Sequence, residues 1–546
     1  MINFSWCSFV RNVDMSGRLI KTLRGAASDC PILGTRSVLT HTQQVKDEKI
    51  DICETEEWAS AKPFETIPGP SKFELLKAFM PGGRYYKKPL PEINRIYRKD
   101  YGEIFMLPGL FGKRNVVCSF DPEDYQKVFR TEGIWPVRRG LDIVHYYRKI
   151  LRPHIFKHAA GLVAEQGENW AHFRKITNPV MMNPKTTKFY VPRMDNAMKE
   201  FIERIKSIRD PKTFEVPVDF ENDLNHWAME SACLVALDTE LGLINHAERN
   251  PEAKEVIDGS KYTFELMYEL DFEPSLWKII PTPKYKRIVE NFDKVTELTI
   301  KYIDAAIERL KNAPNPGKPD SEKSVLERLL NIDREVAIVM AMDILLAGVD
   351  TTSSALTGCL ITLSQNPNKQ DILRSEILKI LPNKDTSLNA DKMKNLPYLR
   401  ACIKEAFRLF PVSVGQFRST GRDLVLNGYR IPKDTDIAMP SQILMRDEKF
   451  YPRPNDFIPE RWLRDVDKAE CPMAKNVNAF VFLPFGFGPR TCIGRRISDL
   501  ELETALCRLI RNFHIQFDYP EDISFKTTIL NSPDFALRFN FKDVEV

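Results

Sequence analysis

The chain has 546 residues, a formal net charge of +4 and ten cysteines, and it contains no Cys-x-x-Cys pair. Its basic residues are spread along the sequence, so we expect no nucleic-acid groove, and the cysteine spacing gives no support to a zinc site, an iron–sulfur site or a disulfide scaffold. No Gly/Ser-rich linker and no internal repeat divides the sequence. We therefore expect one large folded body in a reducing compartment.

The first 45 residues are rich in basic side chains and poor in acidic ones. Arranged as a helix, they place apolar residues on one side and basic residues on another, which is typical of a mitochondrial transit peptide; the alternative is a disordered basic tail. No run of 18 apolar residues occurs, so we expect no transmembrane anchor. We predict a transit peptide at 1–45, a linker at 46–66 and one folded domain at 67–546, which begins with the rigid turn Ile67-Pro68-Gly69-Pro70.

Strand composition appears near both ends of this domain, with helical patterns between them. Asp121 and Pro122 predict the N-cap and first position of one helix, and the pattern is mostly helical from about residue 165 to residue 410. The sequence therefore predicts a mainly α fold with a small β domain at its edge. The predicted strands are 103–107, 114–119 and 425–431, followed by a hairpin between 527 and 541 with its turn at 531–534.

Trp170 and Arg174 are four residues apart in a predicted helix, so their side chains share one face. An aromatic ring beside a guanidinium suits a bound carboxylate, which the ring can stack against and the cation can neutralise. Taken alone, Arg174 is better explained as an ordinary surface cation. His172 lies between them and is expected to be packed or exposed.

The longest uninterrupted helical pattern runs from Arg334 to about Gln365, and its first half is almost wholly apolar. We expect this helix to be buried on nearly every face. The segment Ala347-Gly348-Val349-Asp350-Thr351 sets a glycine and a carboxylate into that core, at a cost in free energy. The segment is therefore either a chemical site or a kinked turn with a back-bonded threonine and an exposed aspartate.

Two later segments carry charges at helical or extended positions. Glu405 and Arg408 share a face of a helix that Pro411 ends. Such an ion pair is usually exposed to solvent and contributes little to stability. Arg418 follows in an extended segment, and Arg461 lies in Pro459-Glu460-Arg461-Trp462.

The run Phe485-Gly486-Phe487-Gly488-Pro489-Arg490-Thr491-Cys492-Ile493-Gly494 places one cysteine in a glycine-rich loop before a predicted helix. The glycines let the backbone approach a flat cofactor, and the first N–H groups of the helix point toward the sulfur. We expect the helix to lower the pKa of the thiol and to present a thiolate, the haem ligand that favours O–O cleavage. Arg490 is expected to neutralise a haem propionate. The plainer explanation is a small buried cysteine.

This loop resembles the haem-binding loop of the cytochrome P-450 superfamily, the haem-thiolate monooxygenases. The segment from Ala347 to Thr351 is similar to the family's Ala/Gly-Gly-x-Asp-Thr pattern, and Glu405-x-x-Arg408 is similar to its Glu-x-x-Arg pair. The resemblance covers nearly everything after Ile67 and looks closest to the insect mitochondrial branch. It implies the cytochrome P-450 fold, a triangular helical domain around a buried haem b (iron protoporphyrin IX), and a monooxygenase activity.

The resemblance implies roles for the matched residues. Thr351, freed from bonding back along its helix, is implied to hydrogen-bond the oxygen under activation, while Asp350 relays protons from solvent. Glu405, Arg408 and Arg461 are implied to form a buried structural triad, with tryptophan in place of the family's usual phenylalanine at position 462. Cys492 is the implied iron ligand, and the other implied haem contacts are Phe485, Arg490, Trp170, Arg174 and Arg418.

Electrons are expected to come from another protein, because no Gly-x-Gly-x-x-Gly follows a strand and no region of reductase size exists. The segment 494–501 resembles the signature of mitochondrial members, which implies a [2Fe-2S] ferredoxin reduced by NADPH through ferredoxin reductase. A basic patch beside the cysteine loop would attract such an acidic carrier; an ordinary solvated face is the alternative. The patch residues are Arg400, Lys404, Arg495 and Arg496.

The expected substrate is an apolar small molecule, either steroid-like or a foreign compound. Its pocket is expected near 412–416, between 133 and 165 and at the turn 530–533. Two rival functions are an electron-independent haem-thiolate isomerase or dehydratase, and a non-catalytic haem sensor. The intact pair Asp350 and Thr351 argues against the first, and the basic patch argues against the second.

The segment Leu276-Trp277-Lys278-Ile279-Ile280 precedes several basic residues. It is either an apolar segment that dips into a membrane surface or an ordinary core-facing loop. The first interpretation implies peripheral contact with the inner mitochondrial membrane on its matrix side.

Overall fold

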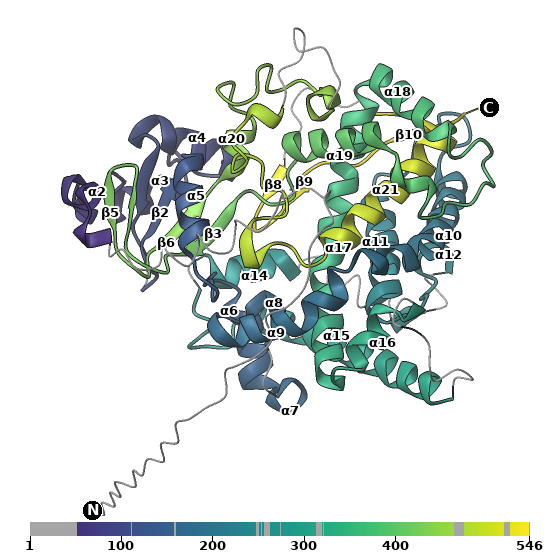
Figure 1. The fold of residues 1–546 in the computed structure, drawn as a ribbon, viewed down its shortest axis with the longest axis horizontal. Coiled ribbons are helices and arrows are strands. Elements are labelled where there is room, and N and C mark those ends of the chain that lie inside the picture. Colours follow the sequence, from purple (N-terminus) through teal and green to yellow (C-terminus); the bar gives the residue numbers. More distant parts are fainter. Residues whose placement is uncertain are drawn as a thin grey trace, which may run out of the picture. The chain divides into compact units, whose positions relative to one another are not determined.

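The computed structural model describes residues 52–544, apart from 111, 158–159, 247–249, 253, 256–262, 274, 313–318, 320–321, 464–473 and 518–524. The expected transit peptide lies outside the described residues. The described part is mainly helical with small β-sheets, as predicted (Figure 1). Between 165 and 410, all regular elements in the described part are helical.

The longer helices carry most of the core. They are α4 (Leu90–Tyr101), α5 (Pro122–Thr131), α9 (Gly167–Met181), α10 (Pro184–Ile208), α11 (Phe220–Ala236), α14 (Thr263–Asp271), α15 (Pro283–Lys311), α17 (Arg334–Ser364), α18 (Pro367–Leu378), α19 (Pro397–Leu409) and α21 (Arg495–Asn512). The shorter helices are α2 (Glu56–Ser60), α3 (Lys72–Phe79), α6 (Asp142–Tyr146), α7 (Pro153–Phe156), α8 (Gly161–Ala164), α12 (Leu243–His246), α16 (Val325–Leu330) and α20 (Ser441–Met445). Strands are β1 (Ile104–Leu107), β2 (Val116–Ser119), β3 (Gln416–Ser419), β4 (Leu424–Leu426), β5 (Tyr429–Ile431), β6 (Asp436–Met439), β7 (Phe513–Gln516), β8 (Phe525–Thr527), β9 (Asn531–Pro533) and β10 (Asn540–Asp543).

Helix α17 crosses the helical core and packs against α11, α19 and α21. Its start is capped by Asp333, whose Oδ1 accepts a hydrogen bond from the Glu335 N–H at 2.8 Å. Within the described part, α17 is long and apolar enough to cross a membrane, but 61% of its most apolar window is buried inside the protein. It is therefore a core helix, as the apolar pattern predicts.

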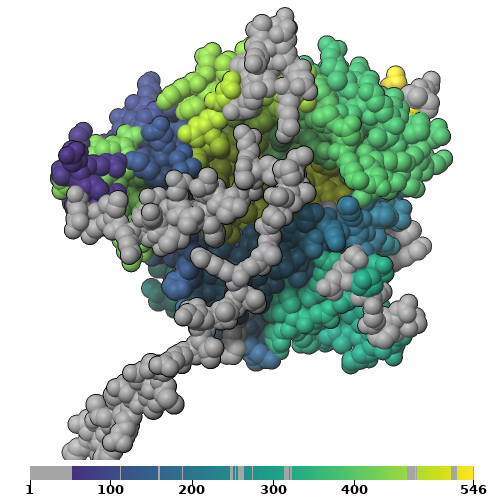
Figure 2. Space-filling model, in the orientation of Figure 1, coloured from purple at the N-terminus to yellow at the C-terminus, as the bar shows by residue number. Residues whose placement is uncertain are grey.

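A four-stranded sheet in the order β1-β2-β6-β3 joins two early strands to two strands from the last third of the chain. Strands β2 and β6 are parallel, while β1–β2 and β6–β3 are antiparallel. The N-terminal segments therefore lie beside residues of the last third of the chain, and Figure 2 shows purple and light-green surfaces side by side. The sheet places Arg418 on β3, opposite Ile437.

The predicted hairpin turn at 531–534 is wrong. Residues Asn531–Pro533 form β9, which pairs with β8, so the turn is 528–530. Asn531 is held in the ladder because its Oδ1 accepts a hydrogen bond from Thr527 Oγ1 at 2.8 Å and its Nδ2 donates to the Pro411 carbonyl at 2.6 Å. The chain near Phe541 pairs instead with β7.

Candidate functional site

The loop before α21 turns back on itself at two glycines. Gly486 and Gly488 have φ of 73° and 72°, a conformation that favours glycine. A Cβ at Gly488 would lie 2.6 Å from a carboxylate oxygen of Glu132, so no larger residue fits without a shift. The Cys492 N–H closes the loop on the Phe485 carbonyl at 2.9 Å. This geometry fixes the cysteine at the mouth of α21.

The Cys492 sulfur receives hydrogen bonds from the backbone N–H groups of Gly494 and Arg495, as the loop predicts. Burial nevertheless raises the pKa of the thiol, because desolvation outweighs these bonds and the attraction of Arg174. The prediction that the helix lowers the pKa of the Cys492 thiol is therefore wrong for the protein without a cofactor. Cys492 nevertheless remains accessible to water, although protein surrounds it closely enough to desolvate the thiol.

Guanidinium groups crowd together beside this cysteine. Burial, and then repulsion from Arg138 and Arg418, lowers the pKa of Arg490 to about 8. Burial and the cations Arg418 and Arg174 lower the pKa of Arg138 to about 10, while the Cys492 sulfur opposes that shift. Arg138 was missed from the sequence, where it is one of two adjacent arginines with no distinguishing spacing. We call Arg138, Arg174, Arg418 and Arg490 the arginine cluster.

One carboxylate compensates the arginine cluster in the described part of the chain. Glu132 accepts a hydrogen bond from Arg418 Nε at 2.6 Å, and both side chains are almost fully buried. Arg490 lies 4.0 Å over the Trp170 ring and donates to the Glu165 carbonyl at 2.9 Å and to Gln166 at 2.7 Å. Arg174 donates to the Thr491 carbonyl at 2.9 Å. The cluster therefore retains a surplus of buried positive charge, which favours an anionic ligand.

Helix α17 has a half-buried stripe in its central part. Ala347, Asp350, Thr351 and Ser354 recur at helical spacing along this stripe. A Cβ at Gly348 would meet Ala232 at an ordinary 3.7 Å, so close packing does not require glycine there. The stripe is one accessible part of a mostly buried helix.

The expectation that Thr351 is free of its helix is wrong. Its Oγ1 donates a hydrogen bond to the Ala347 carbonyl at 2.6 Å, because a threonine inside a helix has the carbonyl four residues back within reach. The hydroxyl proton is therefore committed, and the remaining lone pairs of Oγ1 can accept.

A buried acid links the two helices that carry the predicted site. Glu501 of α21 accepts a hydrogen bond from Thr352 Oγ1 of α17 at 3.1 Å. Burial raises the pKa of Glu501 to about 8, so the group is mainly protonated at neutral pH. No sequence pattern indicates this contact, because the two residues are remote along the chain.

The predicted triad is present and fully buried. Glu405 accepts from Arg408 at 3.0 and 2.8 Å and from Arg461 Nε at 3.2 Å, and all three side chains are 0% exposed. The Trp462 indole N–H also donates to Glu405, at 2.9 Å. Phenylalanine cannot make this bond, so the departure from the family pattern adds a donor.

In the predicted basic patch, nearby carboxylates neutralise more of the positive charge than the sequence indicates. Arg400 pairs with Glu503 at 2.7 Å, and Arg495 pairs more loosely with Asp499 at 3.8 Å. Lys404 is exposed beside the Trp462 ring. Arg496 is half-buried at the start of α21.

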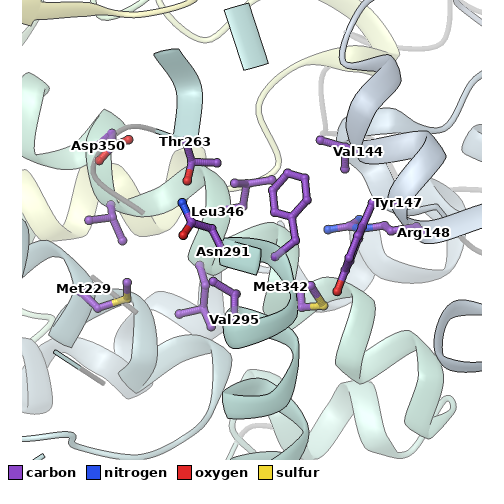
Figure 3. A pocket seen from close by; sticks show the side chains of 13 residues that line it. Val144, Tyr147, Arg148, Met229, Thr263, Asn291, Val295, Met342, Leu346 and Asp350 are labelled. Atoms are coloured by element: carbon purple, nitrogen blue, oxygen red, sulfur yellow. The ribbon is translucent and has the colours of Figure 1, made fainter. Parts of the chain in front are cut away.

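A cavity lies beside α17, and Figure 3 shows the side chains that line it. Val144, Tyr147 and Arg148 bring the predicted 133–165 region to this cavity, and Asp350 lies on its α17 wall. Arg148 forms a buried ion pair with Asp343 of α17 at 2.6 Å. Val412 and Asn531, from the other predicted pocket segments, line a separate groove.

The chain matches the cytochrome P450 family over residues 68–537 and therefore belongs to that family. It is 46% identical over 512 residues to cytochrome P450 CYP12A2 of Musca domestica, an alignment that covers 92% of this chain and 95% of that protein. It is 44% identical over 495 residues to the probable mitochondrial cytochrome P450 12a5 of Drosophila melanogaster, which covers 89% and 92% of the two chains. The probable mitochondrial cytochrome P450 12c1 of the same fly is 44% identical over 491 residues, or 90% and 94%. The protein is thus a cytochrome P450 monooxygenase, an oxidoreductase similar to insect mitochondrial members.

Haem with a thiolate-bound iron is the cofactor of this family. The residues present fit that group: Cys492 is accessible, and the arginine cluster beside it has surplus positive charge. Two propionates supply the negative charge that such a cluster favours.

Proposed function

We propose that this enzyme inserts one oxygen atom of dioxygen into an apolar small molecule, steroid-like or foreign, with Cys492 as the iron ligand. Haem bound through a thiolate supplies the activation of dioxygen and the two-electron oxidation of the substrate. The observation that carries the proposal is the exposed Cys492 sulfur beside the undercompensated arginine cluster. The reaction consumes two electrons and two protons and releases water.

The chain's own residues hold the cofactor and deliver the protons. We assign Arg138, Arg174 and Arg418 to the propionates, and Arg490, which lies against Trp170, to their support. Phe485, which packs edge-on to Phe407 at 5.5 Å, forms part of the cofactor wall. These assignments rest on charge and position beside Cys492.

Proton delivery is assigned to Asp350 and Thr351. Asp350 lines the cavity of Figure 3 and is half-buried, so it can exchange protons with water there. Thr351 keeps its bond to the Ala347 carbonyl and accepts a hydrogen bond from a water through the remaining lone pairs of Oγ1. That water is held beside the oxygen substrate.

We assign the electron supply to NADPH through ferredoxin reductase and a [2Fe-2S] ferredoxin. The relatives named mitochondrial support this assignment. Exposed Lys404 and Arg495, with Arg400 and Arg496 beside them, form the proposed docking surface for the acidic carrier.

We place the enzyme at the matrix face of the inner mitochondrial membrane as a peripheral protein. Leu276, Ile279 and Ile280 are 61%, 79% and 56% exposed, which supports membrane contact. Trp277 instead points inward, with its N–H bonded to the Leu270 carbonyl at 2.9 Å. The segment thus combines the core-facing loop and the membrane-facing segment: Trp277 packs inward, while the apolar side chains around it are exposed.

Reconstitution of the purified holoenzyme with ferredoxin, its reductase and NADPH tests the proposal against a steroid and xenobiotic panel. We expect a product that carries one oxygen atom from dioxygen, detected by mass spectrometry with isotopically labelled oxygen. Turnover without NADPH would instead support an isomerase or dehydratase, and absence of substrate-linked NADPH consumption with the whole panel would support a sensor. Cys492→Ser should remove the red-shifted absorption of the ferrous carbon monoxide complex; retention of that band would contradict the ligand assignment.

A further inference from the structure

A groove with a volume of about 1060 Å³ lies apart from the cavity of Figure 3. Its walls come from α4, from the junction of α17 and α18, from the end of α19, from α20 and from the strands β8 and β9. Arg95 of α4 is exposed at the groove, while Arg446, directly after α20, is half-buried. The groove therefore runs from the surface into the protein.

Arg95 and Arg446 give this groove a surplus of positive charge. Arg446 donates a hydrogen bond to the Leu409 carbonyl and lies 5.5 Å over the Phe410 ring. Burial, and then repulsion from Arg408 and Arg95, lowers the pKa of Arg446 to about 10. In the described part of the chain, no carboxylate lies within ion-pair distance of Arg95 or Arg446.

The other charged groups on the groove wall are already paired. Lys369 pairs with Glu460 at 2.8 Å, and Glu92 of α4 pairs with Lys88, which precedes that helix. Arg453 and Asp456 face each other at 3.9 Å. The two unpaired guanidiniums are therefore the groups that favour an added anion.

Part of the groove wall is apolar, and the groove borders α17, the helix that carries Asp350 and Thr351. Its walls include Leu409, Phe410, Val412 and Phe525. Ser354 also lines it and belongs to the half-buried stripe of α17, three residues after Thr351. A ligand with a charged head at the arginines would thus extend an apolar body along these side chains toward α17.

We propose that this groove binds an amphiphilic small molecule with a carboxylate head, held by Arg95 and Arg446, and guides its apolar body toward the Ser354 side of α17. The inference names a substrate class for the monooxygenase site and rests on that proposed function. Carboxylate geometry matches the guanidinium fork, and the apolar wall supplies the remaining affinity.

Calorimetric titration of the holoenzyme with decanoate and with 1-decanol tests the groove, because the two ligands differ in the head group. We expect decanoate to bind about tenfold more tightly, the size of effect given by a charge-assisted hydrogen bond. Arg95→Glu should remove this preference. Lys99→Glu makes the same charge change at an exposed site on α4 that does not line the groove, and should keep it.

Equal affinities of the two ligands in the wild type, or equal losses in Arg95→Glu and Lys99→Glu, would overturn the proposal. Decanoate should also shift the Soret absorption of the wild type, and this shift should be lost in Arg95→Glu at the same concentration. Titration needs no turnover, so the two proposals can fail separately: a preference for decanoate in an enzyme that oxidises no member of the reconstitution panel would support the groove as a binding site and contradict the proposed function.

Discussion

Two clusters of buried arginines in this protein differ in how their charge is compensated. In the triad, Arg408 and Arg461 share Glu405, and Arg408 also donates to the carbonyls of Met445, Pro454 and Asp456. The arginine cluster beside Cys492 has Glu132 as its paired carboxylate, and the pKa values of Arg138 and Arg490 are lowered there. The triad, whose charges are compensated, stabilises the backbone to which it is hydrogen-bonded. The arginine cluster, whose positive charge exceeds its compensation, indicates a site for an anionic ligand.

Glu405→Gln should disrupt the triad and have the largest effect on stability. It leaves two buried guanidiniums without their shared anion, so the free energy of unfolding should fall by about 3–5 kcal/mol. Chemical denaturation followed by circular dichroism measures this loss. Glu503→Gln removes the partner of the half-exposed Arg400 and should cost about 1 kcal/mol or less; similar losses in both variants would remove the distinction.

Arg138→Gln should weaken the unbalanced cluster without unfolding the protein. Haem should dissociate about tenfold faster, because one propionate partner is lost, while the stability of the haem-free protein should not fall, because repulsion is relieved. Transfer of haem to apomyoglobin measures the rate. Arg139→Gln is the control, since Arg139 pairs with Asp436 at 2.7 Å and belongs to no cluster around Cys492. Unchanged haem retention in Arg138→Gln would contradict the assignment.

Glu501→Gln should change the pH dependence of stability. The folded state keeps the Glu501 proton up to about pH 8, whereas the unfolded chain releases it near 4.5, so this group makes stability fall as pH rises between these values. The slope contributed is at most about 1.4 kcal/mol per pH unit. Denaturation midpoints between pH 5 and pH 8 should therefore fall less steeply in the variant. If the midpoints of the wild type and of the variant fell with pH at the same slope, Glu501 would not titrate as its burial predicts.

Trp462→Phe should produce the smallest effect and sharpen the description of the triad. It restores the family's usual residue and removes the indole donor to Glu405, which should cost about 1 kcal/mol. Equilibrium unfolding measures the change, with haem content as a second readout that should stay constant. A stabilised variant would mean that the tryptophan bond is not favourable here.

The sequence predicted those features that follow from local patterns. Helix α17, its buried character and the cap position at Asp121 follow from periodicity and capping chemistry. The turn at 531–534 was wrong because Asn531 is engaged by Thr527 and Pro411, and the second of these is a tertiary contact. Arg138 and Glu501 were missed because burial and repulsion, which depend on the fold, distinguish them from other charged residues.

The Gly488 backbone and the Glu132 carboxylate occupy adjoining space, so a side chain at position 488 would displace the anion that holds Arg418. The conformation of the loop that carries Cys492 and the charge of the arginine cluster therefore depend on each other. Exchanging the loop for that of a relative, without also exchanging the segment around Glu132, should disturb both the position of Cys492 and the charge that surrounds the cofactor.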